Sequence, residues 1–347
     1  MMLDFLLGIL QGIANSTQNN YGTSFNGVNL SGGMNKYLQG DLTLKNIATA
    51  QQLTQLRNSG QLKYTQIPTF IFGNEMNINH SPLTNIDFYK VYLKMIVEDK
   101  ENITLNYHGI NQWQFDNLMQ IAQDSFEEFS NIYPELTSYF GGIAVRSSYG
   151  GTGGTLTLTF TWDNTGGRFT FNDIQDTIYG CAHVINELKR YGKISDYMSQ
   201  YEKAKVIYQW VIFHSQYAKQ TLRATYTPNG FLFNGSAVCQ AYVGVFNLLC
   251  KMVGINIVGI HGKTTHSQYG STHIWSFAVL DGKPTYIDVT WGDPVFSNEE
   301  TLRFQGINPE NICDFKYFDI SKQELMNTHS WKNNYYEDLI IFNKLRN

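Results

Sequence analysis

Residues 234–294 decide the fold, and three segments stand out in them: NGSAVCQAY (234–242), HIWS (273–276) and YIDVTWGDP (286–294). A helix is predicted across the first segment and up to Gly254, because apolar residues recur there at helical spacing. They are Val238, Tyr242, Val245, Phe246 and Leu249. Three strands are predicted after this helix, at 255–260, 273–280 and 284–289. A helix followed by consecutive strands indicates an α+β fold in which the helix packs on an antiparallel sheet.

The helix is expected to carry a reactive cysteine at its start. Ser236 is a good N-cap residue, so Cys239 is predicted in the first turn. A thiol in this position feels the positive end of the helix dipole and the unpaired N–H groups of the first turn. Both favour the thiolate, which is the nucleophilic form. Cys250 is late in the same helix, where the dipole opposes a thiolate.

The second and third of the predicted strands, at 273–280 and 284–289, are expected to bring a histidine and an aspartate together. Asp281 and Gly282 are a strong signal for a two-residue hairpin loop. With that loop, His273 and Asp288 lie on the same face of the sheet as diagonal neighbours, within reach of each other. A register shifted by one residue would put them on opposite faces. The sequence therefore predicts an imidazole that is oriented by a carboxylate.

Cys239, His273 and Asp288 together are typical of a cysteine-dependent catalytic triad. In such a triad the histidine raises the thiolate fraction and returns a proton, while the aspartate fixes its tautomer and stabilises the imidazolium. Each residue alone is better interpreted as a buried thiol, an exposed imidazole or a surface carboxylate. The order of the three along the chain and the elements that carry them favour the catalytic interpretation.

The same three segments resemble motifs of bacterial transglutaminase-like proteins. NGSAVCQAY is similar to their nucleophile motif, HIWS to their histidine motif, and YIDVTWGDP, the most specific of the three, to their aspartate motif. Weaker likeness extends over roughly residues 65–335. It includes YPEL (133–136), YEKAK (201–205), YFDIS (317–321) and HSW (329–331). Three positions depart from the family pattern and bear on substrate fit: Ala241, Ile274 and Ser276.

The resemblance implies a papain-like core with thiol acyl chemistry, in which Cys239 attacks, His273 acts as base and acid, and Asp288 orients it. The family includes transglutaminases, peptidases and amidases. We expect an enzyme acting on peptide or glutamine amide bonds of a protein or peptide substrate, with hydrolysis favoured over cross-linking. The alternative from another class is a structural or virion-associated protein that uses the domain as a binding module. The Cys239 N–H is the expected oxyanion donor.

Other sequence features are open to two interpretations. Trp210, Gln216 and Tyr217 are candidates for a second oxyanion donor, although each is more simply explained by packing. Trp275 and Trp291 flank the strands that carry the triad, and they are expected either to wall a substrate cleft or to pack in the core.

The composition excludes several other functions. A net charge of −4 without a basic run gives no support for nucleic-acid binding. The four cysteines contain no C-x-x-C pair, so no structural zinc site is expected. No spacing predicts a calcium loop, and we expect no cofactor.

No apolar run is long enough to span a membrane. No Lys or Arg precedes the apolar segment Leu3–Ile13, so no signal peptide is predicted. Charged residues are only 16%, which favours a virion-associated or extracellular protein over a cytoplasmic one.

The chain is predicted to divide into an extension at 1–62 and a transglutaminase-like domain at 63–347. The extension is expected to be an arm packed on the domain or, alternatively, an assembly segment that binds a partner or a sister chain. The domain is expected to contain an α+β subdomain at about 65–165 and a catalytic core at about 172–335. Strands are predicted at 87–97, 103–107 and 154–162. Helices are predicted at 111–133, 172–191 and from a Ser199/Glu202 capping box to about Gln216.

Overall fold

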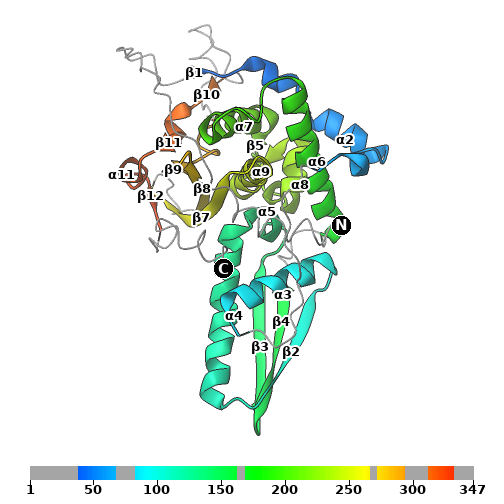
Figure 1. Ribbon diagram of the computed structural model, residues 1–347, viewed down its shortest axis with the longest axis vertical. Coiled ribbons are helices and arrows are strands. Elements are labelled where there is room, and N and C mark those ends of the chain that lie inside the picture. Colours follow the sequence, from blue (N-terminus) through cyan, green and yellow to red (C-terminus); the bar gives the residue numbers. More distant parts are fainter. Residues whose placement is uncertain (1–37, 68–82, 162–168, 266–271, 294–311, 332–347) are drawn as a thin grey trace.

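The computed structural model describes residues 38–67, 83–161, 169–265, 272–293 and 312–331. Figure 1 shows helices gathered around α9 (Cys239–Met252), a five-stranded sheet on one side of them, and a narrower lobe of helices and strands below. The predicted α+β fold, with the cysteine-bearing helix packed on an antiparallel sheet, is confirmed.

The five-stranded sheet carries two of the three predicted site residues on or beside its strands. All of its pairings are antiparallel. In spatial order the strands are β11 (Phe318–Ile320), β9 (Lys283–Ile287), β8 (Thr272–Leu280), β7 (Asn256–Thr264) and β12 (His329–Ser330). Leu280 pairs with Lys283 and Ser276 with Ile287, so the predicted hairpin register is confirmed. Asp281 and Gly282 both have positive φ, as a tight two-residue turn requires.

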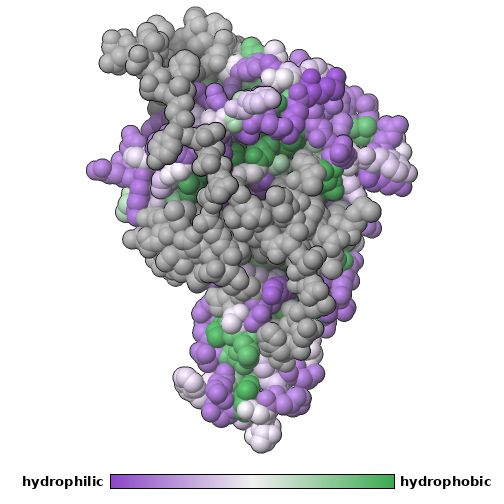
Figure 2. All heavy atoms as spheres, in the orientation of Figure 1, coloured by the Kyte–Doolittle hydropathy of each residue, from purple (hydrophilic) through white to green (hydrophobic). Residues whose placement is uncertain are grey.

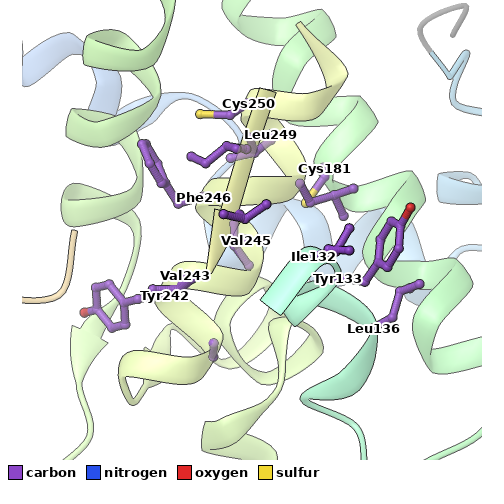
Figure 3. Packing of buried hydrophobic residues seen from close by; sticks show 14 of the residues in the cluster. Ile132, Tyr133, Leu136, Cys181, Tyr242, Val243, Val245, Phe246, Leu249 and Cys250 are labelled. Atoms are coloured by element: carbon purple, nitrogen blue, oxygen red, sulfur yellow. The ribbon is translucent and has the colours of Figure 1, made fainter. Parts of the chain in front are cut away.

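Helix α9 is buried on all sides. Every one of its residues from Ala241 to Met252 is buried, not only the predicted apolar stripe. It contacts β7, β8 and four helices: α5 (Pro134–Thr137), α6 (Phe171–Arg190), α7 (Gln200–His214) and α8 (Pro228–Asn234). Figure 3 shows its side chains packed beside Cys181 of α6 and beside Ile132, Tyr133 and Leu136. A helix that is apolar all round is stable only inside a core. The first residue of α9 is therefore held by the whole domain.

The lower lobe contains a sequence prediction that is wrong. Residues 87–97, predicted as a strand, belong to helix α3 (Asn85–Val97), which begins with a capping box between Thr84 and Asp87. Its polar residues Asp87, Lys90 and Lys94 mark only a narrow stripe at helical spacing, and the buried aromatic and β-branched residues between them favour a strand in the sequence. α3 packs on α4 (Gln112–Ile132), and α4 packs on a three-stranded sheet. The sheet has the order β2 (Asn102–His108), β4 (Gly153–Thr161), β3 (Gly142–Gly150).

The remaining predictions of secondary structure fit the structure with two local corrections. Strands β2 and β4 and helices α4, α6 and α7 lie where they are predicted, and the Ser199/Glu202 capping box is present. Helix α7 ends at His214 because the chain then enters β5 (Gln216–Tyr217). Ser236 is not the N-cap of α9: it lies in β6 (Ser236–Ala237), which pairs in parallel with β5, and Val238 is the N-cap.

The described part of the N-terminal segment packs on the helical body. It forms a 3₁₀ turn at Leu42–Asn46, helix α2 (Ala50–Asn58) and a second turn at Leu62–Tyr64. These elements contact α7, α8 and α6, and they bury Leu44, Leu53 and Leu62. The apolar stripe from Leu3 to Ile13 lies outside the described residues. Hydrophilic residues dominate the described surface in Figure 2, and no helix among the described residues is long and apolar enough to cross a membrane.

A buried ion pair joins α5 to α9, and breaking it is expected to destabilise the fold. Lys251 Nζ lies 2.6 Å from Glu135 Oε1 and also donates to the carbonyl of Ile132. Lys251→Ala leaves an unpaired buried carboxylate, so we expect a loss of about 3–5 kcal/mol in the free energy of unfolding. Urea unfolding measures this loss in the free energy of unfolding. The double change Lys251→Met with Glu135→Leu should recover most of the loss; equal losses in the single and double variants would contradict the ion-pair explanation.

Candidate active site

Local structure places Cys239 at the first position of α9. Helix α8 ends at Gly235, whose φ of 64° is left-handed and suits glycine. The two residues of β6 follow, the Val238 N–H donates to the Thr225 carbonyl at 2.9 Å, and the helix begins at Cys239. The side chain is half-buried, whereas the other three cysteines are buried. Cys239 thus combines access to solvent with the helix start that the sequence predicts.

His273 and Asp288 meet as the hairpin register predicts. His273 Nε2 lies 2.9 Å from Asp288 Oδ2, and the nearby Cys239 thiol joins Asp288 in raising the pKa of this imidazole against the effect of burial. Because Nε2 is engaged with the carboxylate, Nδ1 is the ring nitrogen left for the thiol. The structure therefore brings all three predicted site residues together.

Asp288 accepts four hydrogen bonds inside the protein. It follows β9 directly, and its Oδ1 accepts from the N–H groups of Thr290 and Trp291, both at 3.1 Å. Its Oδ2 accepts from His273 and from His329, the latter at 3.1 Å. Two donors at each oxygen exhaust the usual accepting capacity of a carboxylate. Asp288 is fully buried, so this set of donors is what makes its charge tolerable there.

The electrostatics of the site hold His273 in its charged form. Burial alone would lower the pKa of His273, but the charge and hydrogen bond of Asp288, with the contact to Cys239, raise it well above the ordinary value. Burial would likewise raise the pKa of Asp288, yet the two histidines lower it below its ordinary range. An imidazolium beside a thiol is the partner that a thiolate requires.

The other three thiols have the opposite surroundings. Burial raises the pKa of Cys181, Cys250 and Cys313, which disfavours the thiolate in each of them. Cys250 lies in the last turn of α9, as the sequence predicts. These residues act as apolar side chains of the core.

The sequence interpretation missed His329. This residue begins β12 at the edge of the sheet, is buried, and donates to the same oxygen of Asp288 as His273 does. One signal was available: His329-Ser-Trp331 repeats the His-x-Trp spacing of His273-Ile-Trp275. In a strand this spacing puts the histidine and the tryptophan on one face.

Aromatic rings enclose the two histidines. The His329 ring centroid lies 4.5 Å from that of Trp291 and 4.8 Å from that of Trp275. Trp331 packs edge-on against Trp275 at 5.4 Å. Trp275 is fully buried, so it is a core residue, whereas Trp291 is half-exposed and is the one of the two that can face a substrate. Apolar surroundings of this kind strengthen the charge interactions inside them.

The candidates for a second oxyanion donor differ in position. The Trp210 indole N–H donates to the Ile47 carbonyl at 2.8 Å, so this proposed donor is wrong. Gln216 and Tyr217 form β5, which runs beside β6 just before Cys239. Burial raises the pKa of Tyr217 to about 12, with smaller contributions from the charges of Cys239 and Asp288. Tyr217 therefore lies close to the thiol and stays a candidate, as does Gln216.

Asp293 ties the loop after Asp288 to the nucleophile helix. Its Oδ2 lies 2.6 Å from the hydroxyl of Tyr242, which is three residues after Cys239. The same hydroxyl donates to the Ser215 carbonyl at 3.1 Å. Burial raises the pKa of Asp293 to about 6, although the hydrogen bond that it accepts from Tyr242 lowers it.

Three side chains at the site could also hold a metal ion. Ligand atoms of His273, Asp288 and His329 lie within 4.8 Å of one another. The same atoms are joined by hydrogen bonds of 2.9 and 3.1 Å, so the protons on the two Nε2 atoms already account for their closeness.

Gly292 lets the Asp288 loop approach α7, and adding a methyl group there is expected to disrupt the site. A Cβ at this position would lie 1.8 Å from the Tyr208 hydroxyl, which is buried and bonded to the Asp314 carbonyl. For Gly292→Ala we expect a loss of stability on the order of 1–3 kcal/mol from overpacking, together with a fall in Cys239 alkylation. A thermal melt and an alkylation time course check both effects. Gly150→Ala is a control, because the site of its Cβ is open and its φ is not in the left-handed region; a comparable fall in alkylation there would contradict the explanation.

Comparison with known sequences gives one family. Residues 190–289, which include all three predicted site residues, match the profile of the transglutaminase-like superfamily. Two similar curated proteins are the kyphoscoliosis peptidases of Mus musculus, 27% identical over 106 residues, and of Homo sapiens, 26% identical over 103 residues. The matches cover 27% and 26% of this chain. They span only 16% of the length of each relative.

Two similar solved structures are a proposed cysteine protease from Cytophaga hutchinsonii and a TGase, each 14% identical with a TM-score of 0.28. The first match covers 43% of this chain and 62% of the other chain. The second covers 48% and 49% respectively.

Proposed function

Since residues 190–289 belong to the transglutaminase-like superfamily, we propose that the protein is a cysteine-dependent acyl-transfer enzyme. Cys239 is its nucleophile, His273 its acid and base, and Asp288 the residue that orients His273. The observation that carries the proposal is the continuous contact from the thiol through the imidazole to a buried carboxylate.

The proposed reaction begins at an amide carbonyl of a peptide bond or of a glutamine side chain. The Cys239 thiolate adds to the carbonyl carbon, and the imidazolium of His273 gives a proton to the leaving nitrogen as the C–N bond breaks. A thioester on Cys239 and a free amine, or ammonia from glutamine, result. The neutral imidazole then takes a proton from the incoming acceptor, which attacks the thioester and releases the thiol. The backbone N–H of Cys239, at the helix start, is placed to stabilise the oxyanion.

We favour water as the acceptor, so that the products are a carboxylic acid and an amine. A cross-linking enzyme has to bind a primary amine and exclude water from the thioester, which is a more demanding arrangement. If an amine is the acceptor, the product is a new amide and the enzyme is a transglutaminase.

The test is incubation of the native protein with casein and a fluorescent primary amine, beside a Cys239→Ala control. Hydrolysis predicts new peptides or released ammonia that the control lacks. Cross-linking predicts fluorescence incorporated into casein instead. Mass spectrometry after acid quenching should detect an acyl group on Cys239 in both cases. If the protein and the control behave alike on casein and on a library of glutamine-containing peptides, the enzyme proposal is wrong and a binding module is favoured.

A further inference from the structure

His329 lies in a position that the catalytic proposal leaves unexplained. It is 1% exposed, and both of its ring nitrogens have partners. Nε2 lies 3.1 Å from Asp288 Oδ2, and Nδ1 lies 2.9 Å from the hydroxyl of Thr328. A carboxylate can only accept, so the proton of this first contact is on His329 Nε2.

We propose that His329 is a positioning residue of this site: its hydrogen bond holds Asp288 in the orientation that directs His273 toward Cys239. The inference rests on the proposed function, because it assigns a role within the same site. His329 itself is not a second acid or base, because its other nitrogen faces Thr328, whereas the free side of His273 faces the thiol.

The geometry of Asp288 gives this contact its effect. Two backbone N–H groups of its own loop hold Oδ1, but only side chains hold Oδ2. The hydrogen bond from His273 alone would let this oxygen move together with the imidazole. His329 supplies a second donor that comes from a different strand and takes no part in proton transfer. With it, rotation of the carboxylate about its last bond breaks two hydrogen bonds at Oδ2 instead of one.

A glycine in β7, the strand between β8 and β12, allows His329 to reach the site. Gly262 of β7 pairs with His273 of β8, and β12 lies on the other side of β7. A Cβ on Gly262 would lie 2.4 Å from the Ser330 carbonyl and 2.5 Å from the Trp275 ring. The missing side chain thus leaves room for the Trp275 ring and for the Ser330 backbone, next to which the rings of His273 and His329 lie 5.5 Å apart between centroids. The close packing of two His-x-Trp segments is therefore built into the sheet.

The charges around Asp288 agree with a positioning role. The hydrogen bonds from His273 and His329 both lower the pKa of Asp288. Two tyrosines, Tyr208 and Tyr217, also interact with Asp288. Burial raises the pKa of both hydroxyls, so both stay neutral near pH 7. Among these neighbours, the two histidines are the groups that donate to the carboxylate.

The experiment compares two substitutions of His329 by the alkylation rate of Cys239 between pH 5 and 8. His329→Phe keeps an aromatic ring among Trp275 and Trp291 but removes the donor. His329→Gln keeps an N–H that can reach Asp288. His214→Phe is a matched control, because His214 also stacks on a tryptophan, Trp210 at 4.3 Å, but bonds to the Leu232 carbonyl instead of Asp288. Rates are expressed per folded molecule, from the unfolding curve of each variant.

We expect His329→Phe to lower the alkylation rate roughly tenfold to a hundredfold, as for a misplaced reacting group. Its pH profile should also change, because the charge of His273 is no longer held beside the thiol. His329→Gln should stay within about threefold of the wild type, and the control should keep the wild-type pH profile.

Three results would overturn the inference. In the first, a folded His329→Phe labels Cys239 at the wild-type rate and with the wild-type pH profile. In the second, the Phe and Gln variants lose reactivity equally and only in proportion to a lower melting temperature, which is the result of a packing role. In both cases the proposed function still holds, because Cys239 of the wild type is still alkylated rapidly. The third is a wild-type Cys239 no faster than a free thiol, which removes the proposed function and the inference together.

Discussion

Brief treatment of the native protein with iodoacetamide near pH 6.5 is expected to modify Cys239 roughly a hundredfold or more faster than any other cysteine. Cys239 is half-buried at a helix start and contacts the charged His273. Burial raises the pKa of the other three thiols and shields them from the reagent. Peptide mapping by mass spectrometry at several reaction times measures the four rates separately.

The pH dependence of the labelling separates a charge effect from simple exposure. The pKa of His273 is raised, so the imidazolium persists as the pH rises through its ordinary range, and the charge beside the thiol is present throughout. The wild-type rate should therefore exceed the His273→Ala rate at least about tenfold throughout pH 6–8, whereas simple exposure of the thiol predicts equal rates. Urea should make all four cysteines react alike. A faster rate at Cys181, Cys250 or Cys313 in the native protein would refute the assignment of the nucleophile.

Asp288→Asn is expected to lower turnover on the order of 10³–10⁴-fold while the protein stays folded. The carboxylate accepts two hydrogen bonds on each oxygen. An amide has only one oxygen, so whichever way it is turned, its NH₂ group faces two N–H donors. The imidazole then loses either its orientation or the charge that stabilises its protonated form.

Turnover on a substrate identified with casein or the peptide library, together with the melting temperature, measures this effect. Asp293→Asn is the matched control, because Asp293 is a nearby carboxylate whose partner is the Tyr242 hydroxyl and not a histidine. A hydroxyl can donate to the amide oxygen or accept from its nitrogen, so this change should cost less than about tenfold in turnover. Equal losses in the two variants would show that the loop, and not the carboxylate bonded to His273, determines activity.

The parts of the site that lie in one continuous segment could be predicted from the sequence. A two-residue loop at Asp281–Gly282 fixes the register, and the period of two along a strand then determines which side chains share a face. The contact between His273 and Asp288 spans only 15 positions of the chain, which is within the range of such an argument. The position of Cys239 also follows from local signals, although Ser236 proved to be part of β6 and not the N-cap.

The parts that depend on distant contacts could not be predicted. Helix α3 is mostly buried and has only a narrow polar stripe, so its β-branched and aromatic residues favour a strand in the sequence. The contact between His329 and Asp288 spans 41 positions and depends on a two-residue strand, which has no periodicity to detect. The role of Gly262 appears only when β8 and β12 are seen on either side of β7.

The order of strands in the five-stranded sheet also has a consequence for protein synthesis. The edge strand that carries His329 is translated after every other strand of that sheet, and its contact with Asp288 spans 41 positions. At about 5–20 residues per second, a ribosome needs roughly 2–8 seconds to make that stretch. During this interval the nascent chain already contains Cys239, His273 and Asp288, but the fourth donor to the carboxylate has not been made. With the role proposed for His329, the thiol is expected to reach full reactivity only after the segment that includes β12 has left the ribosome.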